Sequence, residues 1–383
     1  MRTSKIAVFR EANQPLTIET VSVPALGEGE ILVRNEYTTL CRSDLNTFAG
    51  KRTEKTPTIL GHEVVGVIEE MAPGAPALDC RGAALQIGDR VTWAIYASDP
   101  DSWLARAGIP QKAAGLFKYG HEPITPASTL HGGLAEYCVL RRHTPVIRLA
   151  APLPLPVMAL INCSVATVAG SLRLAGPLAQ RNVIVAGAGM LGVIACAMCR
   201  CAGAGQIIVA DVDEERLVTA QKFGANLTLN LRLENHSAKE QLTAWLGGEL
   251  PTVALDYSGV PETMERLMNV LGIGGVAVLV GATFPQRPLQ ISAERLVRNV
   301  HTLKGLHNYN EQDFIGAVNF MELNHQRFPF ASLVEDRFDL DSVNAAFDFG
   351  LKTGAYRVGV RMGQRSLADH KSQISTPWHK PQN

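Results

Sequence analysis

The sequence has no excess of charge of either sign and no cysteine pattern typical of a secreted domain. Its 383 residues include 36 Lys plus Arg and 36 Asp plus Glu, so no net field favours nucleic acid, an anionic membrane or an acidic partner. The seven cysteines are odd in number and irregularly spaced, which excludes a disulfide framework and leaves each to be judged as a thiol or a metal ligand. We therefore expect a small-molecule ligand and no nucleic-acid partner.

The chain also lacks a long hydrophobic segment suited to export or membrane insertion. Residues 1–8 contain no apolar stretch of signal-peptide length. The longest apolar run, residues 183–199, falls just short of a membrane span and contains three glycines at turn spacing. These absences predict a cytoplasmic protein with no transmembrane helix and no membrane partner.

Two patterns along the chain predict two domains, in line with its length, because compact domains cluster at roughly 100–200 residues. The first part alternates short apolar and polar runs, for example at residues 31–33 and 64–68, and is expected to be β-rich. From Asn182 onward, strand-length apolar runs are separated by helix-length stretches, which predicts βαβ units and a parallel sheet. These runs lie at residues 183–186, 206–210, 253–256 and 276–280.

A glycine-rich turn follows the first of these runs. Gly187-Ala188-Gly189-Met190-Leu191-Gly192 has the form G-x-G-x-x-G and lies between the expected strand 182–186 and a helical stretch at 193–202. The first glycine permits a tight turn, the second lets the backbone approach a pyrophosphate, and the third lets helix and strand pack closely. The turn therefore predicts a Rossmann dinucleotide site at Gly187, Gly189, Met190, Leu191 and Gly192.

Asp211 is expected to select the dinucleotide. It ends the second run, about twenty residues after the glycines, where a carboxylate accepts hydrogen bonds from the adenosine ribose. The same charge repels a 2′-phosphate, so NAD is favoured over NADP. Val280, at the end of the run 276–280, is a further predicted cofactor contact.

Three cysteines follow the glycine turn, as Cys196-x-x-Cys199-x-Cys201. Such spacing occurs in metal and redox sites, but here it falls in a helix expected to pack on the sheet. Cysteine behaves there as a small apolar residue, so we interpret all three as packing residues.

Cys41, His62 and Cys163 form a candidate metal set. Two cysteines and one histidine are the ligands of a catalytic zinc that keeps its fourth position open. Each residue taken alone is more easily explained as a buried thiol or a core histidine.

The motifs in order resemble zinc-dependent medium-chain alcohol dehydrogenases. They are Cys41-Arg42-Ser43-Asp44, Gly61-His62-Glu63-x-x-Gly66, Gly88-Asp89-Arg90-Val91, Asn162-Cys163 and the glycine turn. The match runs from about Lys5 to Arg361. It implies a Rossmann doubly wound parallel sheet inserted in a GroES-like β-barrel catalytic domain. The domains would be 1–163 (GroES-like), 164–306 (Rossmann) and 307–383, which completes the catalytic domain and ends in a polar tail.

The resemblance assigns roles at the metal site. Cys41, His62 and Cys163 would bind the catalytic zinc, and Glu63 would be the adjacent acidic residue that transiently coordinates it. Asp44 would orient the ligating histidine, as metal-bound imidazoles generally require.

It also assigns roles around the substrate and the cofactor. Ser43 would accept the substrate proton, Arg42 and Arg357 would contact the cofactor phosphates, and Thr167 would pack under the nicotinamide. Zinc would lower the pKa of the alcohol while hydride passes to NAD. The expected assembly is a homodimer or homotetramer.

Two departures from the family are visible. Relatives often carry a histidine at the end of the proton relay where this chain has Asn46, so the proton must leave through water or another histidine. Relatives also often bind a structural zinc on a C-x2-C-x2-C-x7-C lobe. This chain has Asp99, Ser102, Ala105 and Ala113 at those positions, which predicts one catalytic zinc and no structural zinc.

The substrate is less defined than the chemistry. The segments 108–112 and 116–122, with Asn162-Cys163, resemble a subgroup associated with phosphonate catabolism, while similar dehydrogenases act on cyclitols and other polyols. His121, in the second segment, is either a base in the pocket or a loop histidine. A zinc-free reductase of the same superfamily and a non-catalytic nucleotide-binding protein are the alternatives to an alcohol dehydrogenase.

Overall fold

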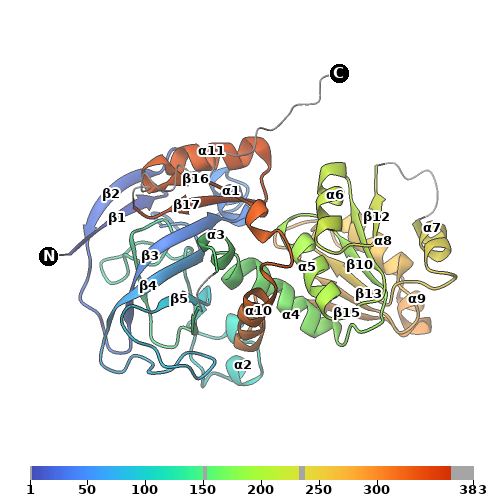
Figure 1. Ribbon diagram of the computed structural model, residues 1–383, viewed down its shortest axis with the longest axis horizontal. Coiled ribbons are helices and arrows are strands. Elements are labelled where there is room, and N and C mark those ends of the chain that lie inside the picture. Colours follow the sequence, from blue (N-terminus) through green and yellow to red (C-terminus); the bar gives the residue numbers. More distant parts are fainter. Residues whose placement is uncertain (1, 150–152, 233–237, 364–383) are drawn as a thin grey trace.

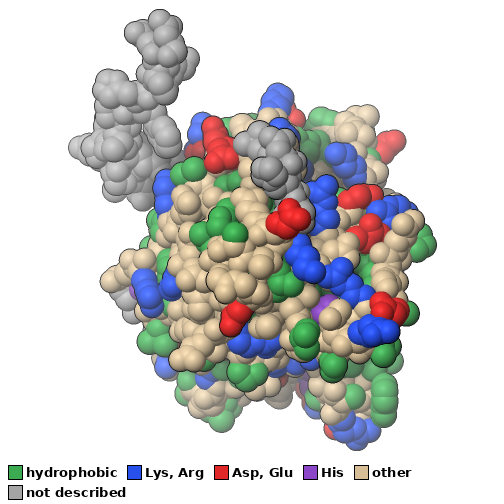
Figure 2. Space-filling view, turned by 90° about the vertical axis from the view of Figure 1, so that its right-hand side faces the viewer, with side chains coloured by type: hydrophobic (Ala, Val, Ile, Leu, Met, Phe, Trp, Pro, Cys, Tyr) green, Lys and Arg blue, Asp and Glu red, His purple; other side chains and the backbone are tan. Residues whose placement is uncertain are grey.

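The computed structural model describes residues 2–149, 153–232 and 238–363; the predicted polar tail beyond Gly363 lies outside them. Two domains lie side by side, and the N-terminal and C-terminal segments meet in the same one (Figure 1). On the face at the Rossmann end of the molecule, basic and acidic side chains are interspersed (Figure 2), as the balanced charge of the chain suggests.

The first domain is built on a mostly antiparallel sheet in the order β16-β17-β3-β4-β5-β9, with β8 also paired to β3. Its strands are β3 (Ile31–Leu40), β4 (Glu63–Met71), β5 (Arg90–Trp93), β8 (Tyr137–Leu140), β9 (Val146–Arg148), β16 (Val334–Asp339) and β17 (Arg357–Arg361). Two smaller sheets pair β1 (Thr3–Val8) with β2 (Thr17–Ser22) and β6 (Tyr96–Ala97) with β7 (Phe117–Lys118). Together they make the β-rich domain that the sequence predicted, and the C-terminal strands β16 and β17 complete its main sheet.

The second domain is an all-parallel sheet in the order β12-β11-β10-β13-β14-β15. Its strands are β10 (Val183–Ala186), β11 (Ile207–Asp211), β12 (Leu227–Asn230), β13 (Val253–Asp256), β14 (Val276–Leu279) and β15 (Thr302–Gly305). The strand order reverses between β10 and β13. In open parallel sheets, ligands bind at the carboxyl ends of the strands at this reversal, so the Rossmann architecture is confirmed with its binding edge defined.

The helices follow both sheets. They are α1 (Arg42–Phe48), α2 (Trp103–Arg106), α3 (Leu155–Met158), α4 (Ala166–Ala175), α5 (Met190–Cys201), α6 (Glu214–Lys222), α7 (Ala238–Trp245), α8 (Pro261–Val270), α9 (Ala293–Arg298), α10 (Glu311–Asn324) and α11 (Val343–Thr353). Single 3₁₀ turns lie at Pro110–Lys112, Phe330–Leu333 and Leu340–Ser342.

A long apolar helix lies between the domains. From Leu155 to Ala175 the helix is long and apolar enough to cross a membrane by length and composition, with a mean hydropathy of 1.7. However, 72% of its most apolar window is buried inside the protein. Its apolar character is therefore explained by packing in the core, where Val157, Leu160 and Val168 share one cluster with β10 and α5 of the Rossmann domain.

Helix α11 closes the first domain from its C-terminal end. Phe347 is fully buried and its ring lies 4.9 Å from that of Phe48 on α1, in a cluster that also contains Ile6 and Val360. The cluster therefore joins the N-terminal strand, the first helix and the last strand.

Phe347→Ala tests this closure. We expect it to lower the free energy of unfolding by about 3–5 kcal/mol, because it removes a fully buried ring and leaves a cavity. Leu351→Ala on the same helix is the matched control, since Leu351 is 39% exposed. Chemical unfolding followed by circular dichroism measures both variants, and equal losses would contradict the docking of α11 described above.

Candidate metal and cofactor site

Cys41 lies where strand β3 passes into helix α1. It occupies the cap position of α1, and its backbone N–H donates to Asp44 Oδ2 at 2.9 Å. Asp44 is 1% exposed, and its other oxygen accepts a hydrogen bond from the backbone N–H of Gly61 at 3.3 Å. One carboxylate thus fixes the two chain segments that carry Cys41 and His62.

His62 lies directly before strand β4, which begins at Glu63. Gly61 has φ +89°, a left-handed conformation that favours glycine, and a Cβ there would lie 3.2 Å from the backbone of Gly133. This turn directs His62 Nδ1 toward Asp44 Oδ1 at 3.5 Å, too long for a good hydrogen bond. Asp44 therefore faces the Nδ1 side of the His62 ring, and its role in orienting a metal-bound imidazole stays a prediction.

Cys163 comes from the long helix between the domains. Residues Ile161–Val165 form a π-helical turn between α3 and α4, a local widening of the helix that is frequent at functional sites. Buried Asn162 anchors this turn, because its amide donates to the carbonyls of His62 and Trp93 at 2.9 and 2.8 Å. Asn162 belongs to the motif Asn162-Cys163, but its role in anchoring the π-helical turn was not predicted from the sequence.

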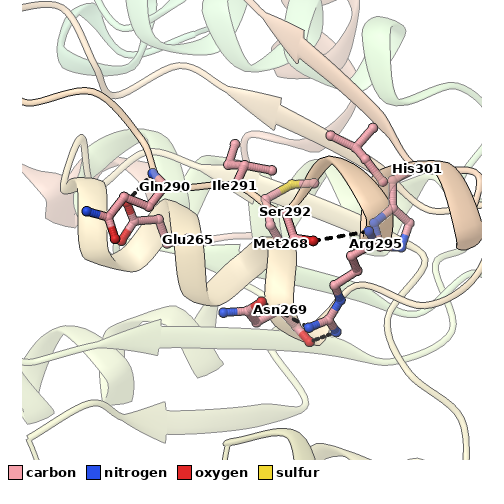
Figure 3. Close-up of a pocket in the computed structure, with 9 residues that line it drawn as sticks. Glu265, Met268, Asn269, Gln290, Ile291, Ser292, Arg295 and His301 are labelled. Carbon is pink, nitrogen blue, oxygen red and sulfur yellow. Dashed lines mark hydrogen bonds between the residues drawn. The ribbon is translucent and has the colours of Figure 1, made fainter.

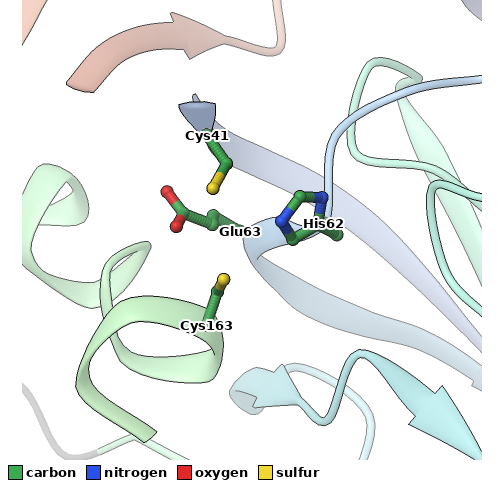
Figure 4. A group of neighbouring side chains, drawn as sticks. All are labelled: Cys41, His62, Glu63 and Cys163. Atoms are coloured by element: carbon green, nitrogen blue, oxygen red, sulfur yellow. The ribbon is translucent and has the colours of Figure 1, made fainter. Parts of the chain in front are cut away.

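These segments bring four possible ligands together (Figure 4). One ligand atom from each of Cys41, His62, Glu63 and Cys163 lies within 4.8 Å of the others, and we call these four residues the metal group. Among the residues that the structure describes, this is the only such group. Cys196, Cys199 and Cys201 do not form one; Cys196 and Cys199 are fully buried on α5, consistent with their interpretation as packing residues.

The electrostatics of the group suit a metal ion. A hydrogen bond from Cys163 holds the pKa of the Cys41 thiol well below its usual value; burial opposes this shift, and the charges of Arg357 and His62 reinforce it. Burial works against protonation of His62, but Asp44 and Cys41 raise its pKa overall. The thiolate is the form of cysteine that binds metals, and a buried set of two sulfurs and an imidazole fits Zn²⁺.

Glu63 forms a buried ion pair with Arg357. Arg357 Nε lies 2.6 Å from Glu63 Oε2, and Nη2 lies 2.8 Å from Oε1. Nη2 also donates to Ser164 Oγ at 2.6 Å and contacts the Cys41 sulfur at 3.5 Å. Burial raises the pKa of Glu63, while Arg357 acts in the opposite direction. The predicted phosphate contact Arg357 is therefore held at the metal group, although it also lines the cleft described next.

An open cleft of about 1130 Å³ runs between the domains, from the metal group to the carboxyl edge of the Rossmann sheet. Cys41, Arg42 and Arg357 line one end, and Gly187 to Leu191 and Asp211 line the other. Arg42 is exposed there, so the structure brings both predicted arginines to the cleft.

The glycine turn has the predicted geometry. Gly187 has φ +93°, and a Cβ on Gly192 would lie 1.8 Å from the Gly187 carbonyl oxygen. At Gly189, by contrast, a Cβ would meet only Arg216 Nη1, at 3.6 Å. Gly187 and Gly192 thus serve the turn itself, whereas Gly189 leaves open space on the cleft side.

Asp211 lies beside this turn. Its carboxylate accepts hydrogen bonds from the backbone N–H groups of Ala188 at 2.5 Å, Val212 at 2.7 Å and Asp213 at 3.0 Å. Arg216 also lines the cleft and was missed from the sequence, although its place in the first turn of the helix after β11 could have indicated it.

Three other predicted residues do not line the cleft. Ser43 is half-buried in the first turn of α1, Thr167 is buried in the first turn of α4, and Val280 directly follows β14. Their assigned roles stay predictions.

His121 lies next to the metal group. Its ring centroid is 5.0 Å from that of His62. Its Nδ1 lies 2.9 Å from Glu54 Oε1 and 3.5 Å from Arg52 Nη2. Burial lowers the pKa of His121, and Glu54 partly opposes this effect. The sequence motifs leave the role of His121 open, and neither Arg52 nor Glu54 could be predicted from them.

The lobe that lacks the four cysteines is held by other contacts. Ser102 Oγ donates to the Asp99 carbonyl at 2.8 Å and accepts from the Ala105 N–H at 3.3 Å, capping α2. Asp99, Ser102 and Ala105, three of the four positions that are cysteines in zinc-binding relatives, are thus linked by hydrogen bonds.

A separate hollow lies between α8 and α9 on the Rossmann domain (Figure 3). Arg295 Nη1 donates to Asn269 Oδ1 at 2.9 Å, and the Gln290 N–H donates to Glu265 Oε1 at 2.7 Å. These contacts fasten α9 and its preceding loop to α8, and we assign no ligand to the hollow.

Gly189→Ala separates cofactor binding from folding. The new Cβ fits the protein, so we expect an unchanged melting temperature, but it occupies the space needed by a pyrophosphate and should weaken NADH binding about ten-fold or more. Gly316→Ala on α10, where a Cβ meets nothing within 4 Å, is the control and should bind NADH normally. Fluorescence titration with NADH measures the affinity of both variants. Unchanged binding by both would contradict the assignment of the glycine turn as the pyrophosphate site.

Comparison with known proteins agrees with this geometry. Residues 27–151 match the family model of the alcohol dehydrogenase GroES-like domain, and residues 191–322 match that of zinc-binding dehydrogenases. The L-threonine 3-dehydrogenase of Streptomyces avermitilis is 26% identical over 347 residues, covering 90% of this chain and 95% of that protein.

Solved structures show the same fold. An alcohol dehydrogenase from Thermotoga maritima aligns with a TM-score of 0.89 and 25% identity, covering 95% of this chain and 100% of that one. A structure from Sinorhizobium meliloti 1021, described as a zinc-binding dehydrogenase bound to NADP, aligns with a TM-score of 0.81 and 20% identity over 94% of this chain and 100% of that one.

The domain architecture, the four clustered ligands and the cleft that ends at the glycine turn lead to one conclusion. The protein is an oxidoreductase that uses zinc and a nicotinamide cofactor, and it belongs to the zinc-dependent medium-chain alcohol dehydrogenase family.

Proposed function

We propose that the protein transfers hydride between a polar alcohol and NAD, with one catalytic zinc per chain and no structural zinc. The observation that carries this proposal is a single cleft, lined at one end by Cys41 of the metal group and at the other by the glycine turn and Asp211. A substrate held at the metal group would thus share this cleft with a bound dinucleotide.

The residues of the chain have distinct parts in this proposal. Cys41, His62 and Cys163 would hold zinc, and Glu63, balanced by Arg357, would be the carboxylate able to coordinate it transiently. When bound, zinc supplies a Lewis acid for the alcohol oxygen and nicotinamide supplies the hydride acceptor. Ser43 accepts the substrate proton and passes it to water, because the amide of Asn46 does not titrate near neutrality.

The residues that would bind NAD also have separate roles in this proposal. Gly187 to Gly192 would cradle the pyrophosphate, with Arg42 and Arg357 as phosphate contacts. Thr167 would pack under the nicotinamide, and Val280 would be a further cofactor contact. Asp211 would hold the adenosine ribose, and its charge would disfavour the 2′-phosphate of NADP.

The substrate is a hydroxyphosphonate, a cyclitol or another polyol, supported by the resemblance of segments 108–112 and 116–122 to a phosphonate-associated subgroup. We place the protein in the cytoplasm as a homodimer or homotetramer, with domain boundaries at 1–163, 164–306 and 307–383. A spectrophotometric screen of hydroxyphosphonates, cyclitols and diols with NAD tests the activity, and no NADH formation from any of them would refute it.

Metal analysis tests the zinc assignment. Purified protein should contain about one zinc per chain, and Cys163→Ala should lose it together with turnover while NADH binding remains, because Cys163 lies outside the glycine turn. Cys201→Ala, which removes a half-buried cysteine outside the metal group, should keep zinc and activity. Two tightly bound zincs in the wild type would contradict the assignment to a single site.

Asp211→Asn tests cofactor choice. The amide retains one acceptor oxygen for the turn but removes the charge, so we expect the preference for NAD over NADP to fall about ten-fold or more. Values of kcat/KM with both cofactors measure this preference. Wild-type protein that already used both equally well would show that Asp211 does not select the cofactor.

A further inference from the structure

A group of basic side chains lies beside the metal group, and the activity proposed above gives it no role. We call Arg52, Lys112 and Lys118, together with the neighbouring imidazole of His307, the cationic cluster. They come from three separate parts of the chain: the segment after α1, the segment from the turn Pro110–Lys112 to β7, and the segment after β15. Lys112 and His307 are exposed, whereas Arg52 and Lys118 are half-buried.

The cluster is connected to the metal group through His121. Arg52 Nη2 lies 3.5 Å from His121 Nδ1, and the His121 ring lies 5.0 Å from the ring of His62. One imidazole therefore separates the Arg52 guanidinium from a metal ligand. This short path places a fixed positive charge near the metal group.

The two lysines of the cluster have neutral partners. Lys112 Nζ contacts His307 Nδ1, and Lys118 Nζ donates to Asn308 Oδ1 at 3.2 Å. No carboxylate of the described residues forms an ion pair with either lysine. Burial, with Lys112 and Arg52 nearby, lowers the pKa of Lys118 to about 8. Burial and the same three cations lower the pKa of His307 to about 4.

Nearby carboxylates leave this positive charge largely unbalanced. Glu54 lies 2.8 Å from Arg52 but is shared with His121. Glu122 Oε2 lies 3.7 Å from Lys55 Nζ, outside the cluster, and its Oε1 accepts a hydrogen bond from the backbone N–H of Lys118 at 3.3 Å, so it offsets part of the Lys118 charge. The metal group does not require the cations, because Asp44 faces His62 and backbone N–H groups and Glu63 pairs with Arg357.

Cations gathered in a partly desolvated place repel one another, and an anionic ligand removes that cost. We propose that the cationic cluster binds an oxyanion of the substrate, so that the alcohol oxidised here carries a phosphonate, phosphate or carboxylate group. The proposal rests on the dehydrogenase function above and narrows its substrate from polar alcohols in general to anionic ones. Arg52 and Lys118, which are half-buried, bind the oxyanion, and exposed Lys112 attracts it. Neutral His307 contacts the Lys112 ammonium.

The kinetic test uses alcohols that differ only in the distal group: hydroxypropylphosphonate, hydroxypropyl phosphate, hydroxybutyrate and propanediol. Zinc-loaded wild type should oxidise one or more of the anionic alcohols with a higher kcat/KM than propanediol. Arg52→Gln, Lys118→Met and Lys112→Met should each lower kcat/KM for the preferred anion about 10- to 100-fold, with little effect on propanediol. The ranking of the three anions identifies the oxyanion.

Two control variants distinguish the loss of positive charge in the cationic cluster from other effects of a substitution. Lys118→Arg should restore much of the lost kcat/KM because it keeps the charge, and Lys222→Met on α6 removes an exposed lysine elsewhere and should change nothing. Lys112 is exposed, so its variant provides a test that does not depend on a buried substitution.

A binding measurement makes the proposal independent of turnover. Methylphosphonate is titrated by calorimetry into zinc-loaded protein saturated with NADH, so that the cofactor's own phosphate contacts are filled. Binding that weakens in the three variants supports the cluster even if no alcohol is oxidised, in which case only the dehydrogenase proposal fails. Oxidation of propanediol with no preference for anions, and methylphosphonate binding unaffected by the variants, would overturn the anion site and leave the dehydrogenase function standing.

Discussion

The buried ion pair between Glu63 and Arg357 is the interaction on which the arrangement of the site depends. It joins the first residue of β4 to the first residue of β17, which lie 294 positions apart in the sequence. Burying either charge alone would be strongly unfavourable, so the pair requires both strands in place. Since Arg357 also contacts Cys41 and Ser164, closure of the first domain by the C-terminal segment and assembly of the metal group are one event.

The cleft is formed by elements of both domains, including the strand that carries Arg357. The metal group is built from the end of β3, the start of β4 and the helix that leads into the Rossmann domain. The glycine turn lies at the reversal of strand order in the parallel sheet, where carboxyl ends of strands leave a crevice. Both domains therefore contribute walls to one space, and the residues from 354 to 357 line it from the C-terminal side.

Much of this could be predicted from the sequence because it is encoded locally. The parallel strands and the glycine turn follow from short apolar runs and fixed spacings, and the metal ligands follow from motifs. The partners of those residues could not be predicted. The segment after α1, with Arg52 and Glu54, packs against the segment after β7, which carries His121. No local sequence pattern predicts a contact between two such distant segments. For the same reason, Arg357 was assigned to phosphate alone, and its pairing with Glu63 was not foreseen.

The π-helical turn at Ile161–Val165 has a mechanical consequence for the protein. The helix that contains it packs against the Rossmann core, yet it presents Cys163 to Cys41 and His62, which adjoin strands β3 and β4 of the first domain. A metal bound by Cys41, His62 and Cys163, as proposed above, would therefore link the helix between the domains to the sheet of the first domain. The position of this helix against β4 would then set the distance between the Cys163 sulfur and the His62 imidazole, so metal affinity and domain arrangement would be coupled.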